Sequence, residues 1–122
     1  MSVWFNENYL YRQPITVDFS GVTGTPTTKD VRITVPADWD LFWDNVRSDL
    51  LDVVVTNEEG VVMTFQRTNV NFSNKELKLE IDAVEVASDN IIQQLFLFYG
   101  YSSESSDRST SFTASSPETG HI

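Results

Sequence analysis

The side chains best suited to chemistry in this chain are carboxylates, and several of them lie close together in the sequence. Five aspartates fall within one short stretch, at positions Asp38, Asp40, Asp44, Asp49 and Asp52. Ca²⁺ prefers such oxygen ligands, but the stretch does not have the spacing of an EF-hand loop. We therefore expect these acids to cap and solvate a short helix, and we predict no metal site and no cofactor. A structural Ca²⁺ held in the loops is the alternative.

A second pair of acids, Glu80 and Asp82, is spaced so that both side chains lie on one face of a strand. A glycosidase needs two carboxylates that face each other across a cleft, about 5–10 Å apart. Lys78 shares the face of Glu80 and Asp82, and alternation of this kind is typical of a strand's solvent-exposed face. The pair does not indicate a glycosidase.

Other catalytic arrangements are incomplete. His121 is the single histidine, and it lies in a stretch rich in serine and threonine, so it does not indicate a Ser–His–acid triad. The segment 21–24 lacks the third glycine and the following helix of a phosphate-binding loop. We predict that the protein is not an enzyme.

The dominant pattern along the chain is the alternation of apolar and polar residues that β-strands with one buried face require. It covers residues 15–19, 31–35, 51–55, 61–65, 77–81 and 91–99. Turn-forming residues separate these runs, as in the segment 57–60, which ends in a glycine. Six or more short strands predict an all-β fold, an antiparallel β-sandwich or jelly roll.

The last of these runs is apolar on both faces. Phe96 and Phe98 point to one side, and the intervening apolar residues point to the other. Such a strand is either central, with cover on both sides, or leaves one face for a partner. Phe96 and Phe98 are therefore candidate interaction residues.

One segment has the period of a helix instead. Its apolar residues with the spacing i, i+3, i+4, i+7 are Trp39, Phe42, Trp43 and Val46. Asp38 stands where it can cap the first turn. We predict a short helix over 38–47 that covers one open end of the sandwich. In an alternative interpretation, Trp39 or Trp43 is a platform on which a sugar ring stacks.

The last part of the chain loses the hydrophobic pattern. Eleven of the 21 residues from Ser102 onward are Ser or Thr, and Phe112 and Ile122 are the only large apolar ones. Ordering the backbone costs roughly 1–2 kcal/mol per residue, which so little apolar surface cannot offset. We predict a β-sandwich domain over 1–100 and an extended C-terminal arm over 101–122, held by its own domain, a sister subunit or a larger assembly. Phe112 and Ile122 are its candidate contacts.

The net charge of −10 makes the chain strongly acidic. Such a charge repels nucleic-acid phosphates and anionic lipid surfaces, so we expect neither partner. No run approaches the ~20 apolar residues of a membrane span, and the first residues do not have the pattern of an export signal. We expect the protein to be made in the cytoplasm of its host. Cysteine is absent, so no disulfide contributes to stability.

Three motifs occur in an order that resembles a known family. Trp4 precedes the run Tyr11-Arg12-Gln13-Pro14-Ile15-Thr16-Val17, an aspartate-led β-run over 48–60 ends in an acidic turn with glycine, and 95–100 ends in Phe-Tyr-Gly. This order is similar to a domain of unknown function with a concanavalin-like jelly-roll sandwich, found in bacterial and archaeal surface proteins and in phage proteins. The resemblance implies a sandwich fold and a binding or scaffolding role, and it implies no catalytic residues.

These features together predict a non-enzymatic structural protein of a virion. The most specific form is a phage capsid decoration (cement) protein, or another head or tail component, that binds the shell through the sandwich and the arm. Its expected partners are further copies of itself, as in a trimer, and the major capsid or another virion protein. The alternative is a concanavalin-like glycan-binding module.

Overall fold

The computed structural model describes residues 6–17, 28–85, 93–104, 107–114 and 118–122. The elements in these ranges are β1 (Tyr11–Val17), β2 (Thr28–Thr34), α1 (Asp40–Asn45), β3 (Val54–Thr56), β4 (Phe65–Asn71), β5 (Glu76–Glu85), β6 (Gln93–Tyr99) and β7 (Glu118–His121). The predicted all-β fold class is confirmed.

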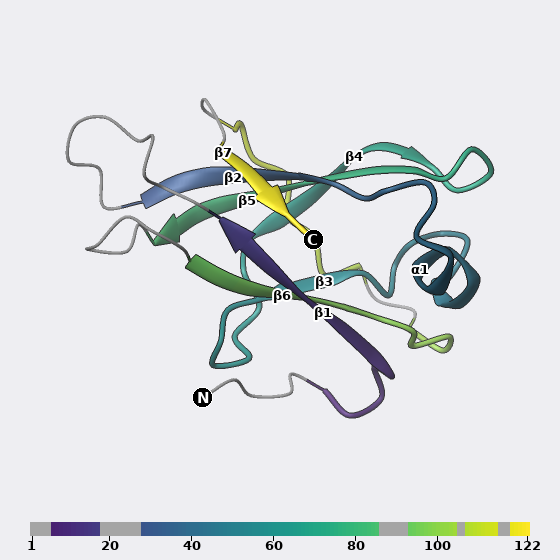
Figure 1. Ribbon diagram of the computed structural model, residues 1–122. Coiled ribbons are helices and arrows are strands. Elements are labelled where there is room, and N and C mark those ends of the chain that lie inside the picture. The colour runs from purple at the N-terminus through teal and green to yellow at the C-terminus, as the bar shows by residue number, and fades with distance from the viewer. Residues whose placement is uncertain (1–5, 18–27, 86–92, 105–106, 115–117) are drawn as a thin grey trace.

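The strands form one sheet in the order β3-β6-β1-β7-β2-β5-β4. One half consists of β3, β6 and β1, the other of β2, β5 and β4, and the two halves pack as a sandwich (Figure 1). Strand β7 lies between the halves, antiparallel to β1 and parallel to β2. The other strand pairs are antiparallel.

The two strands at the ends of this order, β3 and β4, follow each other in the chain. Thr56 in β3 forms an isolated bridge with Val62, and the Met63 N–H donates to the Val55 oxygen at 2.9 Å. Gly60 adopts the left-handed conformation that the turn requires, with φ 79°. Because this hairpin joins the edges, the sandwich is barrel-like, which leaves little open sheet edge on that side.

The core is built from the inward-facing residues of both halves. Fully buried examples are Ile15 and Val17 in β1, Val31 and Ile33 in β2, and Leu79 and Ile81 in β5. Burying each such side chain contributes about 1.5–3 kcal/mol. The alternation read from the sequence therefore has its expected cause in β1, β2 and β5, where one face of the strand is turned toward the core.

Helix α1 covers one end of the sandwich, as predicted (Figure 1). Phe42 and Trp43 are buried, and the Phe42 ring lies 5.1 Å from the ring of Tyr99. The predicted capping by Asp38 is wrong: Trp39 is the N-cap residue, and no side chain caps the helix. The Trp39 ring stacks on Phe42 at 5.0 Å, so aromatic packing fixes the chain where it enters the helix.

The division of the chain at residue 100 also needs correction, because part of the predicted arm belongs to the sheet. Residues 118–121 form β7 in the middle of the strand order. Farther up the arm, the Tyr9 hydroxyl and the Arg108 Nε both donate to the buried Glu104 carboxylate, at 2.6 and 3.0 Å. Of the three predicted holders of the arm, its own domain is the one that the structure shows in contact with it.

Candidate functional site

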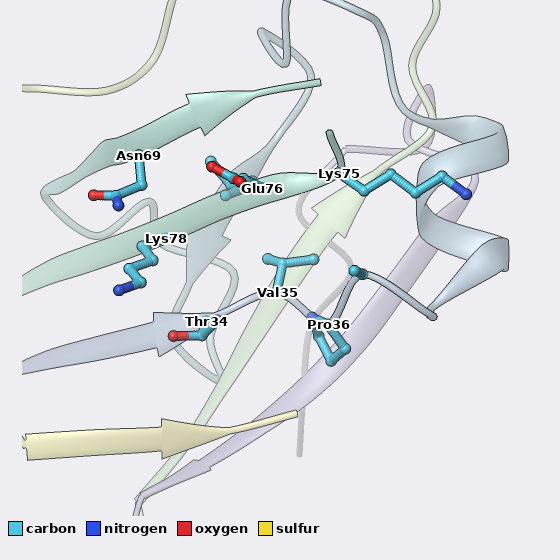
Figure 2. Close-up of a pocket in the computed structure, with 9 residues that line it drawn as sticks. Thr34, Val35, Pro36, Asn69, Lys75, Glu76 and Lys78 are labelled. Atoms are coloured by element: carbon cyan, nitrogen blue, oxygen red, sulfur yellow. The ribbon is translucent and has the colours of Figure 1, made fainter. Parts of the chain in front are cut away.

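A pocket of about 430 Å³ opens where β2 ends beside the hairpin between β4 and β5 (Figure 2). Its lining residues are Thr34, Val35, Pro36, Ala37, Asn69, Lys75, Glu76, Leu77 and Lys78. The ladder between β4 and β5 changes register between Thr68 and Asn71. Such irregularities redirect side chains at the end of a strand. Asn69 and Lys75 adopt the left-handed conformation, with φ 51° and 55°.

Two lysines, Lys75 and Lys78, line the pocket together with the carboxylate of Glu76. Each arginine is engaged: Arg32 with Glu80, Arg47 with Asp49, Arg67 with Asp107, Arg108 with Glu104, and Arg12 over the ring of Phe96. Within the described residues, no ion pair involves Lys75 or Lys78. In a chain of net charge −10, two ammonium groups against the one carboxylate of Glu76 leave the pocket lining with a net positive charge.

The polar groups of the pocket do not all point the same way. In Figure 2 the side chains of Thr34 and Lys78 project to one side, and that of Lys75 extends toward α1. Thr34 and Lys78 are directly opposite in the β2–β5 ladder. A hydroxyl and ammonium groups donate hydrogen bonds to carboxylates and other anionic acceptors. The arrangement is suited to holding an anionic group of a partner.

Exposed apolar side chains lie on segments that meet at the same end. Leu41 in α1 is 52% exposed, Val70 in β4 50%, and Leu10 just before β1 68%. Ring contacts join these segments: Trp43 of α1 lies 6.1 Å from Phe72 in the β4–β5 hairpin, and Tyr11 of β1 lies 5.2 Å from Tyr99. We call the pocket together with Leu10, Leu41 and Val70 the α1 end.

The sequence singled out no residue of the α1 end as a binding residue, and Lys78 was named only as part of a solvent-exposed strand face. Leu41 lies outside the helical stripe, and Leu10 and Val70 lie outside the clearest alternating runs. Two of the three lysines fall within four residues, at 75 and 78, which was the one local signal. It does not reveal which cations are paired, because that depends on residues distant in sequence.

Phe96 and Phe98, the candidate anchors for a partner, are instead core residues. They are 4% and 0% exposed, since β6 lies between β3 and β1 and both of its faces are covered. The Arg12 guanidinium lies 4.5 Å from the centre of the Phe96 ring, a cation–π distance. Strand β6 is therefore apolar on both faces because it is central in the sheet, and not because one face is left for a partner.

The two apolar residues of the predicted arm are placed differently. The Phe112 N–H donates to the Gln66 Oε1 of β4 at 3.0 Å, and the side chain of Phe112 is half-buried. Ile122, just after β7, is 37% exposed. Of the two, Ile122 presents the larger apolar surface to a partner.

Trp39 and Trp43 offer little surface for a sugar. Trp43 is 3% exposed, and its Nε1 donates to the Pro36 oxygen at 2.8 Å. Trp39 packs against the core on Phe42 and Tyr99. A stacking platform needs an exposed ring face, so the structure corrects the proposal for Trp43.

The aspartates of the stretch 38–52 do not act together. Asp38, Asp40 and Asp44 are exposed, whereas Asp52 is fully buried. No group of three metal-binding side chains was found in the part of the chain that the structure describes. Asp49 pairs with Arg47, whose hydrogen bond lowers the pKa of Asp49 to about 2. Asp52 accepts three backbone N–H groups, from Arg47, Gly100 and Tyr101, at 3.0, 3.1 and 3.1 Å.

Glu80 and Asp82 lie on one face of β5 with separate partners. Arg32 and Gln66 both donate to the Glu80 carboxylate, and the hydrogen bond from Arg32 lowers the pKa of Glu80. Burial, and then a hydrogen bond and repulsion from Asp30, raise the pKa of Asp82. The two acids thus have opposite shifts without facing each other across a cleft.

We expect Asp82→Asn and Glu80→Gln to change stability in opposite directions. A raised pKa means that the folded state binds the proton of Asp82 more tightly than the unfolded chain does. The protonated carboxyl therefore contributes to stability at low pH, and this contribution is lost as pH rises from about 4 through the folded pKa. Asp82→Asn should therefore stabilise the fold at pH 7 and have less effect near pH 4. Glu80→Gln should destabilise it at pH 7, with the difference shrinking as pH falls. Urea unfolding at several pH values measures both, and equal signs at pH 7 would contradict this account.

In the described residues no helix is long and apolar enough to cross a membrane. Comparison of the chain with protein-family models, curated proteins and solved structures gave no match. The motif resemblance to a concanavalin-like family therefore stays a prediction.

Proposed function

We propose that this chain is a non-enzymatic structural protein of a virion, a phage capsid decoration protein or another head or tail component that attaches to the protein shell. The observation that carries the proposal is the α1 end. This end carries exposed apolar side chains and a pocket whose two lysines have no ion pair within the described residues.

Apolar and charged groups have different roles in such an attachment. Burying apolar surface contributes about 25 cal/mol per Å² and supplies most of the binding free energy. Lys75 and Lys78 favour a partner that presents carboxylates, and they orient an otherwise acidic molecule of net charge −10. The partner surface that fits the α1 end is therefore apolar with acidic groups at its margin.

The position of the arm changes how attachment would occur. Because Glu104, Thr110, Phe112 and the strand 118–121 are held by the protein's own domain, we assign the attachment to the body of the sandwich rather than to a free strap. Self-association into a small oligomer remains part of the proposal, since decoration proteins commonly act as symmetric oligomers.

Leu41→Glu should weaken attachment to the shell about tenfold or more, because burying a leucine side chain contributes about 1.5–3 kcal/mol and each 1.4 kcal/mol is tenfold. Val61→Glu is the matched control: Val61 is 57% exposed but lies in the β3–β4 hairpin. The measurement is co-sedimentation of each purified variant with phage particles from the strain that encodes the chain. Particles that neither contain nor bind the wild-type chain would contradict the proposal. Equal losses of attachment for both variants would show that the α1 end is not the attachment surface.

A further inference from the structure

Strand β7 is the connection between the two halves of the sheet. Among the described strands, it alone pairs with both halves, with β1 at Thr16 and Val17 and with β2 at Val31 and Arg32. The space between β1 and β2 therefore accepts an incoming strand on two sides. We call this space the β7 slot.

The β7 slot is selective for the strand that fills it. A Cβ atom added to Gly120 would lie 3.0 Å from Val31 Cγ1, 3.1 Å from Ile33 Cγ1 and 3.3 Å from Ile15 Cγ2. All three neighbours are fully buried. A strand without glycine at this position would have to displace packed core side chains. The slot thus requires glycine at this position, which this chain's own residues 118–121 supply.

Phe112 and Thr119 lie at the two ends of a row of residues that crosses one half of the sheet. Phe112 is hydrogen-bonded to Gln66 of β4, and Gln66, Glu80, Arg32 and Thr119 occupy one row across β4, β5, β2 and β7. Three strand spacings of about 4.8 Å make this crossing roughly 14 Å. The seven Cα steps from Phe112 to Thr119 reach up to about 25 Å. The reach exceeds the distance to the chain's own slot, so the chain length between Phe112 and Thr119 does not tie β7 to that slot.

We propose that two copies of this protein associate by exchanging β7, so that the residues 118–121 of each copy occupy the β7 slot of the other. Exchange preserves the pairing with β1 and β2 and the fit at Gly120, because the entering strand has the same sequence. The reach limits the geometry: the slot of the partner must lie within about 25 Å of Phe112. High local concentration favours this state by mass action. The inference goes beyond the proposed function, since it concerns the purified protein without any shell.

Cysteine trapping on the full-length chain tests the exchange. Because the chain has no native cysteine, each disulfide formed must involve the introduced residues. Thr16 in β1 and His121 in β7 are directly opposed, and Cβ atoms at such positions lie about 4.5–5.5 Å apart, near disulfide distance. Separately purified Thr16→Cys and His121→Cys chains are mixed at high concentration, incubated and oxidised. We expect a covalent heterodimer, at least about tenfold above the yield of a Val61→Cys and His121→Cys control mixture. The second pair, Arg32→Cys with Thr119→Cys, repeats the test at the β2 side.

The double variant Thr16→Cys/His121→Cys calibrates the outcome. It should form a disulfide within one chain at low concentration, and circular dichroism should show that each single variant keeps its β-structure. Efficient disulfide formation within the double variant, together with heterodimer yields at the control level for both pairs, would overturn the proposal. Failure of the double variant to close would overturn it as well, because the slot would then not hold β7 as described.

Discussion

A chain that lacks residues 118–122 is expected to lose cooperative folding. The deletion removes β7, leaves facing edges of β1 and β2 without partners, and uncovers part of the packing of Ile15, Val31 and Ile33 around Gly120. Each of these fully buried side chains contributes about 1.5–3 kcal/mol when buried. A loss on the order of 5 kcal/mol would approach the whole stability of an ordinary domain, about 5–15 kcal/mol.

Deletion of Ile122 alone is the matched control for this experiment. Ile122 follows β7 and is 37% exposed, so its removal should change the free energy of unfolding by about 0.5 kcal/mol or less. Thermal unfolding followed by circular dichroism distinguishes the two deletions. A chain without 118–122 that unfolds cooperatively near the wild-type temperature would show that β7 is dispensable for the fold.

Asp52→Ala is expected to be the most damaging single substitution of a polar residue, at about 3–5 kcal/mol. The buried carboxylate joins the segment after α1 to the segment after β6, because it accepts the N–H groups of Arg47, Gly100 and Tyr101. A buried donor left without an acceptor costs about 1–3 kcal/mol, and alanine leaves three. Burial raises the pKa of Asp52 against the opposing effect of these hydrogen bonds, so the carboxylate is held by its partners in an unfavourable environment.

Asp49→Ala separates this effect from the loss of any nearby charge. Asp49 lies three positions away, is exposed, and pairs with Arg47 at 2.7 Å. Exposed ion pairs contribute about 0–1 kcal/mol, so this variant should remain close to the wild type in urea unfolding. Equal losses for the two variants, or a loss below about 1 kcal/mol for Asp52→Ala, would mean that water replaces the carboxylate oxygens.

The parts of the fold that could be predicted are those with a local hydrophobic period. Alternation located the body of β2, β5 and β6, and the spacing of Phe42 and Trp43 located the helix that covers one end. The predicted run 61–65 was wrong for the most part, since it shares only its last residue with β4 (Phe65–Asn71). Strand β7 could not be found this way, because the residues Glu-Thr-Gly-His have no apolar alternation. Its contact with the core is made by Gly120, whose side chain is a hydrogen atom and leaves no hydrophobic signal.

The roles of the candidate-site residues depend on partners that are distant in the sequence, so these roles could not be predicted from the sequence alone. In the sequence, the neighbours of Asp52 do not differ in kind from those of the solvated aspartates before it. What makes Asp52 different is its hydrogen bond from the N–H of Gly100, 48 positions later. From the sequence alone, Phe96 cannot be told from an exposed anchor residue. The structure shows that β3 lies beside its strand and that Arg12 packs on its ring. The lysines of the α1 end stand out only after each arginine has been assigned its partner.

The place of β7 in the sheet also determines the order of events during folding. Thr16 pairs with His121, a separation of 105 residues, and β7 follows every other described strand along the chain. Contacts of such long range form slowly, because the closure of a long loop precedes the contacts that offset its entropy. Until β7 arrives, β1 and β2 each present an unpaired edge beside apolar side chains, the state in which β-proteins aggregate. Refolding yield should therefore fall with protein concentration more steeply than native stability alone implies.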